Sequence, residues 1–303
     1  MKLFKSILNS LPFLAVFFAA FYFYRQELDI SLQKPDFFLL SMSMILLFCV
    51  FCLRGILWHR ILLKFNINVS IRDALDSQFR TILLKYIPGK FWILLGKANI
   101  ISNHGHSLKL CSLIALFLQL LMVLSGFAVG VVGLIFSGFF EIASVLLYAA
   151  FFVCLGILVC ISKGGRVPSL ILKIFPERIS SSLSARKLPS LLFFSAICVI
   201  QWLILGVAYV LFFYSIGFDA GYYPSLLQPL ANNIGIIATF APGGLGVREG
   251  VMIGYLYIAG LSVSGAATVS IAARIWFFFG ECIIFIAGLA IHWQARRGEQ
   301  KTE

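Results

Sequence analysis

Two stretches of this sequence carry charged side chains beside proline-glycine breaks in otherwise apolar runs. The first broken segment, residues 73–103, contains Pro88-Gly89, and the second, residues 225–260, contains Pro242-Gly243-Gly244-Leu245-Gly246. A charge at the centre of a bilayer costs at least about 2.5–3.5 kcal/mol, so such residues are expected to face a cavity or each other. The charged and amide side chains predicted to bind substrate are Arg80, Lys90, Lys97, Asn232, Asn233, Arg248, Glu249 and Arg274.

The second break predicts an anion site. Proline supplies no N–H and glycine permits close backbone approach, so the following half-helix should begin near Val247 with free amides. A helix N-terminus attracts anions, and the guanidinium of Arg248 in its first turn would bind phosphate in bidentate fashion. Lys90 occupies the comparable place after the first break. The pattern predicts a two-sided cationic site near the midplane for a phosphate-bearing substrate.

A structural role for the same residues is the alternative. Arg248 and Glu249 could satisfy each other as an internal ion pair, or Glu249 could pair with Arg274 or Lys90. Arg274 and Glu281 are seven residues apart and so share a helix face. Asn232 and Asn233 could contact substrate or satisfy the carbonyls of a broken helix.

Composition places these segments in a membrane. Hydrophobic residues make up 61% of the 303 residues and charged residues only 12%, whereas soluble domains carry about 25% charged residues. A water-soluble, secreted disulfide-bonded or nucleic-acid-binding protein is therefore excluded. The net charge of +12 is typical of basic cytoplasmic loops and of attraction to anionic lipid.

The chain is expected to be an all-α integral membrane protein in a single polytopic domain, residues 1–303. A spanning helix needs about 20 apolar residues. Six stretches qualify: 7–24, 37–58, 109–136, 139–161, 189–216 and 264–292. Each half of a broken segment is too short to cross, so both segments are predicted to be re-entrant helical hairpins lined by protein or a water-filled cavity.

Basic residues orient the spans. With the N-terminus inside, sixteen lysines and arginines face the cytoplasm, Arg54 among them, and only Arg25 and Lys34 face out. The largest cytoplasmic segment is the basic loop 162–188. We expect both termini to be cytoplasmic, in the cell (inner or plasma) membrane.

The two halves, 1–138 and 139–303, repeat one pattern. Pro88 and Pro242 are 154 residues apart, and the same offset carries span 37–58 onto 189–216 and span 109–136 onto 264–292. Span 7–24 does not follow the offset, because the basic loop lengthens the second half. Three crossings per half would make the halves inverted, which is the plan of many secondary transporters.

The two motifs resemble a known family. Tyr86-Ile87-Pro88-Gly89-Lys90-Phe91-Trp92 with Gly96-Lys97, and Ala241-Pro242-Gly243-Gly244-Leu245-Gly246-Val247-Arg248-Glu249-Gly250, are similar to the lysylphosphatidylglycerol synthase transmembrane-region, or flippase-like domain, family. Arg274 also looks like a family arginine. Phe91 stands where a small aliphatic residue is more usual and Lys97 where arginine is more usual, which puts those contacts in doubt.

The resemblance implies transport of an anionic, aminoacylated or polyprenyl-phosphate-linked lipid between leaflets. A member of the family, the multiple peptide resistance factor, joins such a flippase region to a lipid-aminoacylating synthase domain. Only 11 residues follow His292 here, so we expect flippase or scramblase activity without lysyl-lipid synthesis. The expected partners are the lipid and a lipid- or glycan-synthesising enzyme, without nucleic acid.

Three other functions stay open. A membrane glycosyltransferase using a polyprenyl-phosphate sugar donor would employ paired acids such as Glu27 and Asp29, which otherwise are solvated loop charges. A non-catalytic partner of a synthase would not transport alone, and ion-coupled solute uptake would depend on Glu249 and Glu281. We expect no cofactor and no metal: no phosphate loop is present, and Cys49/Cys52 and His104/His106 suit apolar filler and an interfacial loop.

Overall fold

The described elements of the chain are all helical. A computed structural model describes residues 35–87, 91–141, 188–219, 221–238 and 244–299. Within these ranges there is no strand. The helices, in chain order, are α3 (Phe37–Lys64), α4 (Ile71–Arg80), the 3₁₀ helix η1 (Ile82–Tyr86), α5 (Phe91–Ser102), α6 (Leu108–Phe136), α10 (Leu188–Ser215), α11 (Tyr222–Ser225), α12 (Gln228–Ile237), α13 (Val247–Ile258) and α14 (Val263–Glu299).

Four helices are long and apolar enough to cross a membrane. They are Phe37–Lys64, Leu108–Phe136, Leu192–Ser215 and Val263–Gln294, and they correspond to four of the six predicted spans. The chain is therefore a multi-pass membrane protein. Predicted span 7–24 lies outside the described residues, as do 139–161 beyond residue 141 and nearly all of the basic loop.

Short polar residues start the long helices. Asp36 accepts hydrogen bonds from the amides of Phe38 and Leu39 at the start of α3. Ser70 caps α4 through the amide of Asp73, and Ser107 caps α6 through the amide of Leu110. Each cap satisfies an amide that has no intrahelical partner, so each helix begins at a defined residue.

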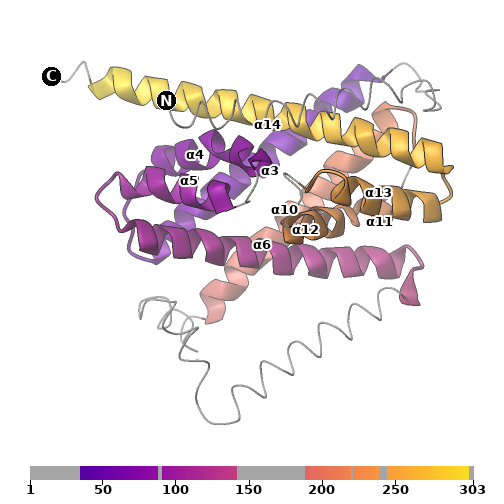
Figure 1. The fold of residues 1–303 in the computed structure, drawn as a ribbon, viewed down its shortest axis with the longest axis horizontal. Helices are drawn as coiled ribbons and strands as arrows, with labels where there is room; N and C mark the ends of the chain where they lie inside the picture. The colour runs from indigo at the N-terminus through magenta and orange to yellow at the C-terminus, as the bar shows by residue number, and fades with distance from the viewer. Residues whose placement is uncertain (1–34, 88–90, 142–187, 220, 239–243, 300–303) are drawn as a thin grey trace, which may run out of the picture.

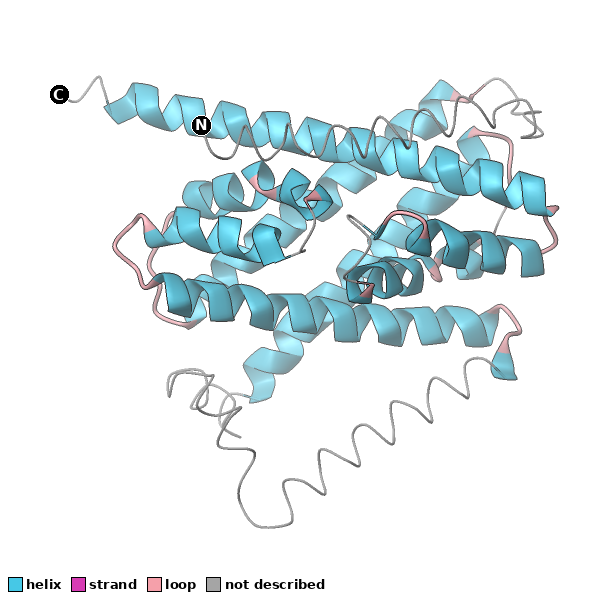
Figure 2. Cartoon of the chain, viewed as in Figure 1, coloured by secondary structure: helices cyan, strands magenta, loops and turns pink. Residues whose placement is uncertain are grey.

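Each broken segment forms two helical arms that pack on each other. In the first segment α4 and η1 pack on α5, and in the second α12 packs on α13. The two pairs lie at opposite ends of the space between α6 and α14 (Figure 1). Figure 2 shows α3 and α10 crossing behind them, and these two helices share the most extensive contact of the fold.

The helix bounds follow the predicted offset of 154 residues. Adding 154 to the bounds of α3 gives 191–218, and α10 covers 188–215; the shifted α6 covers 262–290, and α14 begins at 263. The shifted α5 covers 245–256, against 247–258 for α13.

Helices related by the offset also pack against helices related by the offset. Helix α5 packs on α6 as α13 packs on α14, and α4 packs on α14 as α12 packs on α6. The described helices of the two halves thus correspond in order and in the neighbours named above.

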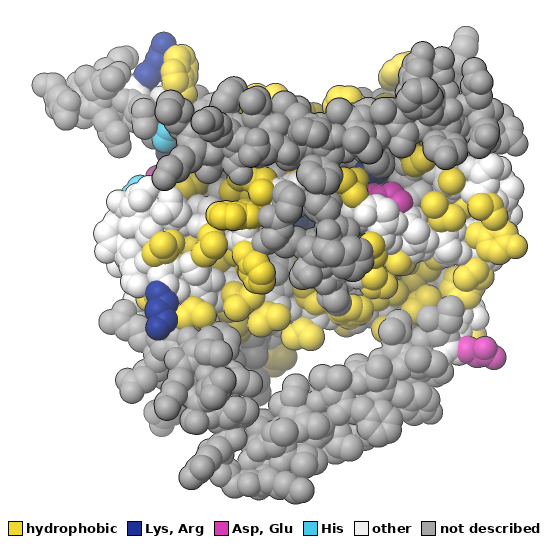
Figure 3. All heavy atoms as spheres, viewed as in Figure 1, with side chains coloured by type: hydrophobic (Ala, Val, Ile, Leu, Met, Phe, Trp, Pro, Cys, Tyr) yellow, Lys and Arg dark blue, Asp and Glu magenta, His cyan; other side chains and the backbone are white. Residues whose placement is uncertain are grey.

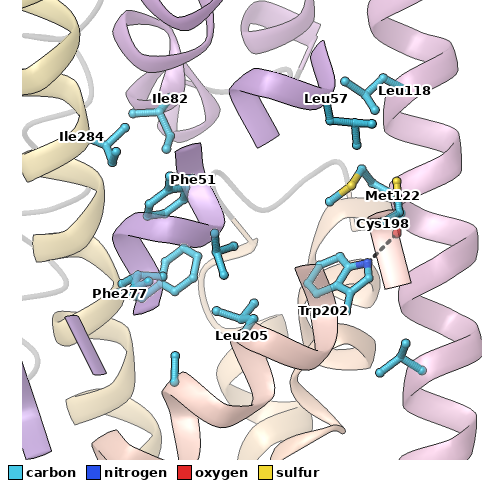
Figure 4. Packing of buried hydrophobic residues seen from close by; sticks show 14 of the residues in the cluster. Phe51, Leu57, Ile82, Leu118, Met122, Cys198, Trp202, Leu205, Phe277 and Ile284 are labelled. Carbon is cyan, nitrogen blue, oxygen red and sulfur yellow. Dashed lines mark hydrogen bonds between the residues drawn. The ribbon is translucent and has the colours of Figure 1, made fainter. Parts of the chain in front are cut away.

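One apolar core joins the two halves. Phe51 of α3 meets Phe277 of α14 edge to face, with ring centroids 5.7 Å apart, and both lie in the cluster of Figure 4. Trp202 of α10 packs against α6, where its indole N–H donates to the carbonyl of Met122 at 3.0 Å. The indole therefore buries its ring without leaving its polar atom unsatisfied.

Large apolar side chains also cover the outside of the long helices. Leu124, Val132 and Ile286 are among many that are exposed, and Figure 3 shows hydrophobic side chains over much of the described part of one face. A soluble monomer rarely exposes such contiguous apolar surface. These outer faces are suited to contact with lipid.

Two glycines make a matched pair that tests the packing of α4 on α14. A Cβ on Gly288 would lie 2.8 Å from Cβ of Phe79 and 2.9 Å from the backbone nitrogen of Arg80, whereas a Cβ on Gly254 would meet nothing within 4 Å. We expect Gly288→Ala to destabilise the protein by about 1–3 kcal/mol through overpacking. Gly254→Ala should stabilise it by about 0.5–1 kcal/mol through helix propensity.

The measurement is the thermal unfolding midpoint of both variants in the same detergent. A lowered midpoint for Gly288→Ala beside a raised or unchanged one for Gly254→Ala is the expected result. Equal shifts of the same sign would contradict the close approach of the two helices.

Candidate functional site

The break in the second segment ends in two glycines of left-handed backbone conformation. Gly244 has φ 72° and Gly246 has φ 81°. A Cβ on Gly244 would lie 3.0 Å from Cα of Gly235, so the arms meet backbone to backbone. Helix α13 begins at Val247, as predicted. The other predicted break residues, Pro88, Gly89, Pro242 and Gly243, lie outside the described residues, as does Lys90.

Glu249 fastens the start of α13 to α14. Its Oε2 accepts the amide N–H of Gly246 at 2.7 Å, and its Oε1 lies 3.3 Å from Nη1 of Arg274. The carboxylate thus caps its own helix and forms a buried ion pair with the next one. Not every amide at this helix start is free, in contrast to the prediction, because the first-turn acid uses one of them.

Arg248 points away from Glu249 and toward α10. Its Nη2 donates to the hydroxyl of Tyr209, and its guanidinium carbon lies 4.6 Å from the ring centroid of Phe277. The residue is only 4% exposed. Among the described residues its hydrogen-bonding partner is a neutral phenol, and the structure pairs Glu249 with Arg274 instead of with Arg248.

The first segment is fastened to α14 by a second carboxylate. Lys85 and Tyr86, at the end of η1, both donate to Glu281, Lys85 to Oε1 and the tyrosine hydroxyl to Oε2 at 2.8 Å. The ammonium of Lys85 also lies 5.1 Å from the ring centroid of Phe277. The guanidinium carbon of Arg274 lies 5.4 Å from the ring centroid of Tyr86. The ends of both segments therefore meet around α14.

These contacts define a central cluster. Its charged members are the cations Lys85, Arg248 and Arg274 and the acids Glu249 and Glu281, and the phenols of Tyr86 and Tyr209 complete it. Three cations face two carboxylates, so the cluster carries a net positive charge. Of the predicted substrate-binding residues the structure brings together Arg248, Glu249 and Arg274 here.

Arg54 is a cation inside α3 that turns toward α10. It was counted among the cytoplasmic cations, and it lies ten residues before the end of α3 at Lys64. Its Nη2 and Nε both donate at 2.8 Å to the side-chain carbonyl of Gln201, with the amide carbonyl turned toward the guanidinium. Its position inside the predicted span 37–58 was the signal that could have identified it.

Lys97 and Arg80 lie apart from the central cluster. Lys97 is 5% exposed, and its ammonium lies 4.5 Å from the ring centroid of Trp58. Arg80 forms an ion pair with Asp76 one turn earlier in α4. Asp76, which the sequence reasoning did not weigh, gives Arg80 a structural partner.

The two predicted asparagines differ in their surroundings. Asn233 is fully buried, and its Nδ2 donates to the carbonyl of Val123 on α6 at 2.9 Å. Its amide also lies against Gly126, where a Cβ would come within 2.6 Å of Nδ2. Asn233 therefore joins α12 to α6, while Asn232 is only partly buried.

The histidine motif outside the two segments lies near one acidic side chain. Within the described ranges, no three His, Cys, Asp or Glu side chains are grouped to hold a metal ion. Nε2 of His104, an exposed side chain, lies 3.9 Å from Oδ1 of Asp73. Glu27 and Asp29, the acids of the glycosyltransferase alternative, lie outside the described residues.

Comparison with known proteins gives one result. The family model described as Lysylphosphatidylglycerol synthase TM region matches residues 7–284, which is most of the chain and includes every member of the central cluster. No curated protein and no solved structure matches the sequence.

The ion pair between Glu249 and Arg274 can be tested by a double-mutant cycle. Removing one partner of a buried pair leaves an uncompensated charge and costs about 3–5 kcal/mol. We expect Glu249→Gln to destabilise the protein by that amount, although glutamine can still accept the Gly246 amide. Combining Glu249→Gln with Arg274→Met should cost clearly less than the sum of the two single changes.

The measurement is chemical or thermal unfolding in detergent. Asp219→Asn is the control, because Asp219 is exposed and asparagine retains the acceptor for the amide of Gly221. Strict additivity of the two central changes would show that the pair does not contribute as a unit.

Proposed function

Because this chain belongs to the lysylphosphatidylglycerol synthase transmembrane-region family, we propose that it moves a lipid with a phosphate-bearing headgroup between membrane leaflets. The observation that carries the proposal is the central cluster, where three cations, the buried Arg248 and Arg274 and the partly buried Lys85, face two buried carboxylates. The lipid would be an anionic or aminoacylated phospholipid or a polyprenyl-phosphate-linked lipid. The membrane would be the cell membrane, with both termini in the cytoplasm.

Arg248 is the proposed headgroup ligand. Its guanidinium is held by a neutral hydroxyl and an aromatic face, so its charge is not neutralised by a bound carboxylate. A phosphate oxygen can accept from the remaining guanidinium N–H groups in a charge-assisted bond. Arg274 and Lys85 have carboxylate partners and would add to the positive field instead of binding first.

The arrangement of the two broken segments supports a transport mechanism. In each segment one arm packs on α6 and the other on α14, with the order reversed between the two segments. This is expected if both segments are re-entrant and the halves are an inverted repeat. Transporters of that plan bind substrate where broken helices meet near the midplane. A headgroup reaching the cluster from one leaflet would leave toward the other when the two segments shift relative to each other.

The proposed activity would be driven by a lipid concentration difference, by coupling to an ion or the membrane potential, or by a synthase that consumes or supplies the lipid. A synthase is accordingly the protein partner that we propose.

The test is leaflet exchange in phosphatidylcholine proteoliposomes with headgroup-labelled lipids and quenching of the outer leaflet. Labelled phosphatidylglycerol, lysyl-phosphatidylglycerol, phosphatidylethanolamine and polyprenyl phosphate are compared. We expect protein-dependent exchange of at least one of them, reduced at least about tenfold by Arg248→Gln, since a hydrogen bond to a charged group contributes about 1.5–3 kcal/mol.

Lys109→Gln is the matched control, since Lys109 is an exposed cation at the start of α6 and its loss should leave the rate unchanged. The Arg248→Gln protein must retain the unfolding midpoint of a folded protein for the comparison to hold. Absence of exchange for every lipid with folded wild-type protein would reject the transporter function. Sugar-donor turnover would then be measured next.

A further inference from the structure

Lys97 is a buried cation that has no carboxylate partner among the described residues. It lies on α5 and is 5% exposed, and the contact that holds its ammonium is the face of Trp58, 4.5 Å away. The indole N–H of Trp58 in turn donates to Ser77 at 3.0 Å. A cation–π contact supports the ammonium but supplies no negative charge.

A second cation lies one helical turn from the ring that holds Lys97. Arg54 and Trp58 are four residues apart on α3 and so share a helix face, and the ammonium of Lys97 lies on the face of Trp58. The guanidinium of Arg54 is bound by the neutral amide of Gln201, and the residue is partly exposed.

The carboxylate that acts on Arg54 already accepts hydrogen bonds from other residues. Glu281 of α14 exerts its field on Arg54, but its two oxygens accept from Lys85 and Tyr86. From α10 the groups that face Arg54 are Gln201 and the thiol of Cys198, both neutral. Neither Arg54 nor Lys97 therefore forms an ion pair within the described residues.

We propose that Arg54 and Lys97 form a second phosphate-binding subsite, separate from Arg248. Two cations held together in low-dielectric surroundings repel each other, and an anion between them removes that repulsion. Arg54 offers planar N–H donors for a phosphate oxygen and Lys97 a compact charge. The amide of Gln201 and the face of Trp58 hold both cations in place without neutralising them.

The subsite deepens the proposed function, on which its physiological role rests. Lys97 lies six residues after Phe91, about 9 Å along α5 from the break at about 1.5 Å per residue. The headgroup would therefore meet cations at two positions, one along the first broken segment and one at the ends of both segments. A substrate with one phosphate would occupy them in turn.

The test is ligand-dependent thermal stability of the full chain in a zwitterionic detergent. Inorganic phosphate and short-chain phosphatidylglycerol are titrated separately against wild type, Arg54→Gln, Lys97→Met and Lys97→Arg. Arg60→Gln is the matched control, because Arg60 is an exposed cation on the same helix as Arg54. The same variants are then assayed for leaflet exchange.

We expect the ligand to raise the unfolding midpoint of wild type, Arg60→Gln and Lys97→Arg. The apparent affinity should fall at least about tenfold in Arg54→Gln and Lys97→Met. Without ligand, Lys97→Met should unfold at the same or a higher temperature, since it removes a repulsive charge. A response to both probes identifies phosphate in general, and a response to phosphatidylglycerol alone identifies the lipid headgroup; both support the subsite.

Two results would overturn the inference. One is an undiminished ligand response in Arg54→Gln and Lys97→Met, and the other is no response of wild type to either probe. Failure of the proposed function gives a different pattern, namely absent leaflet exchange with ligand binding that still depends on Arg54 and Lys97. If exchange depends on Arg248 but neither exchange nor ligand binding depends on Arg54 and Lys97, the function stands and the subsite is rejected.

Discussion

The cost of placing charge inside an apolar helix bundle governs this structure, and Glu249 shows how the chain meets it. One oxygen of the carboxylate satisfies the Gly246 amide at the start of α13, and the other pairs with Arg274. A single side chain thereby caps a broken helix, neutralises an arginine and holds the second broken segment on α14. Without it, a helix start and a guanidinium would both be left in surroundings that cannot solvate them.

Helix α14 holds both broken segments through charges of opposite sign. Glu281 binds Lys85 and Tyr86 of the first segment, and Arg274, two turns earlier on the same face, binds Glu249 of the second. The first segment thus presents a cation to an acid of α14, and the second presents an acid to a cation of α14. The two carboxylates of the central cluster are thus consumed in positioning, and the charge left over is positive, at Arg248 in the cluster and at Arg54 and Lys97 beside it.

The features predicted from sequence are those set by local pattern. Hydropathy and length identified the four long helices that the structure describes, and the Pro-Gly-rich break correctly placed the start of α13 at Val247. The family was also identified correctly, since its two motifs are local in sequence. The hydrogen-bond and ion-pair partners of the charged side chains were harder to predict, because they depend on which helices become neighbours. Arg54 was counted as a cytoplasm-facing cation by a rule that counts charges near span ends. Only the packing of α10 on α3 shows that the side-chain carbonyl of Gln201 accepts hydrogen bonds from its guanidinium. Asp76 was overlooked although it stands one turn before Arg80.

The same pairing that positions the cations also limits how an anion can bind to them. An anionic headgroup at Arg248 adds negative charge beside the ion pair of Glu249 and Arg274, and so competes with Glu249 for the arginine. Any weakening of that pair loosens the start of α13 and its hold on α14 at the same time, because one carboxylate makes both contacts. The hold of Glu281 on the first segment does not pass through Glu249. If the chain transports lipid as proposed, anion binding at Arg248 would therefore weaken the hold of α14 on the second segment but not its hold on the first.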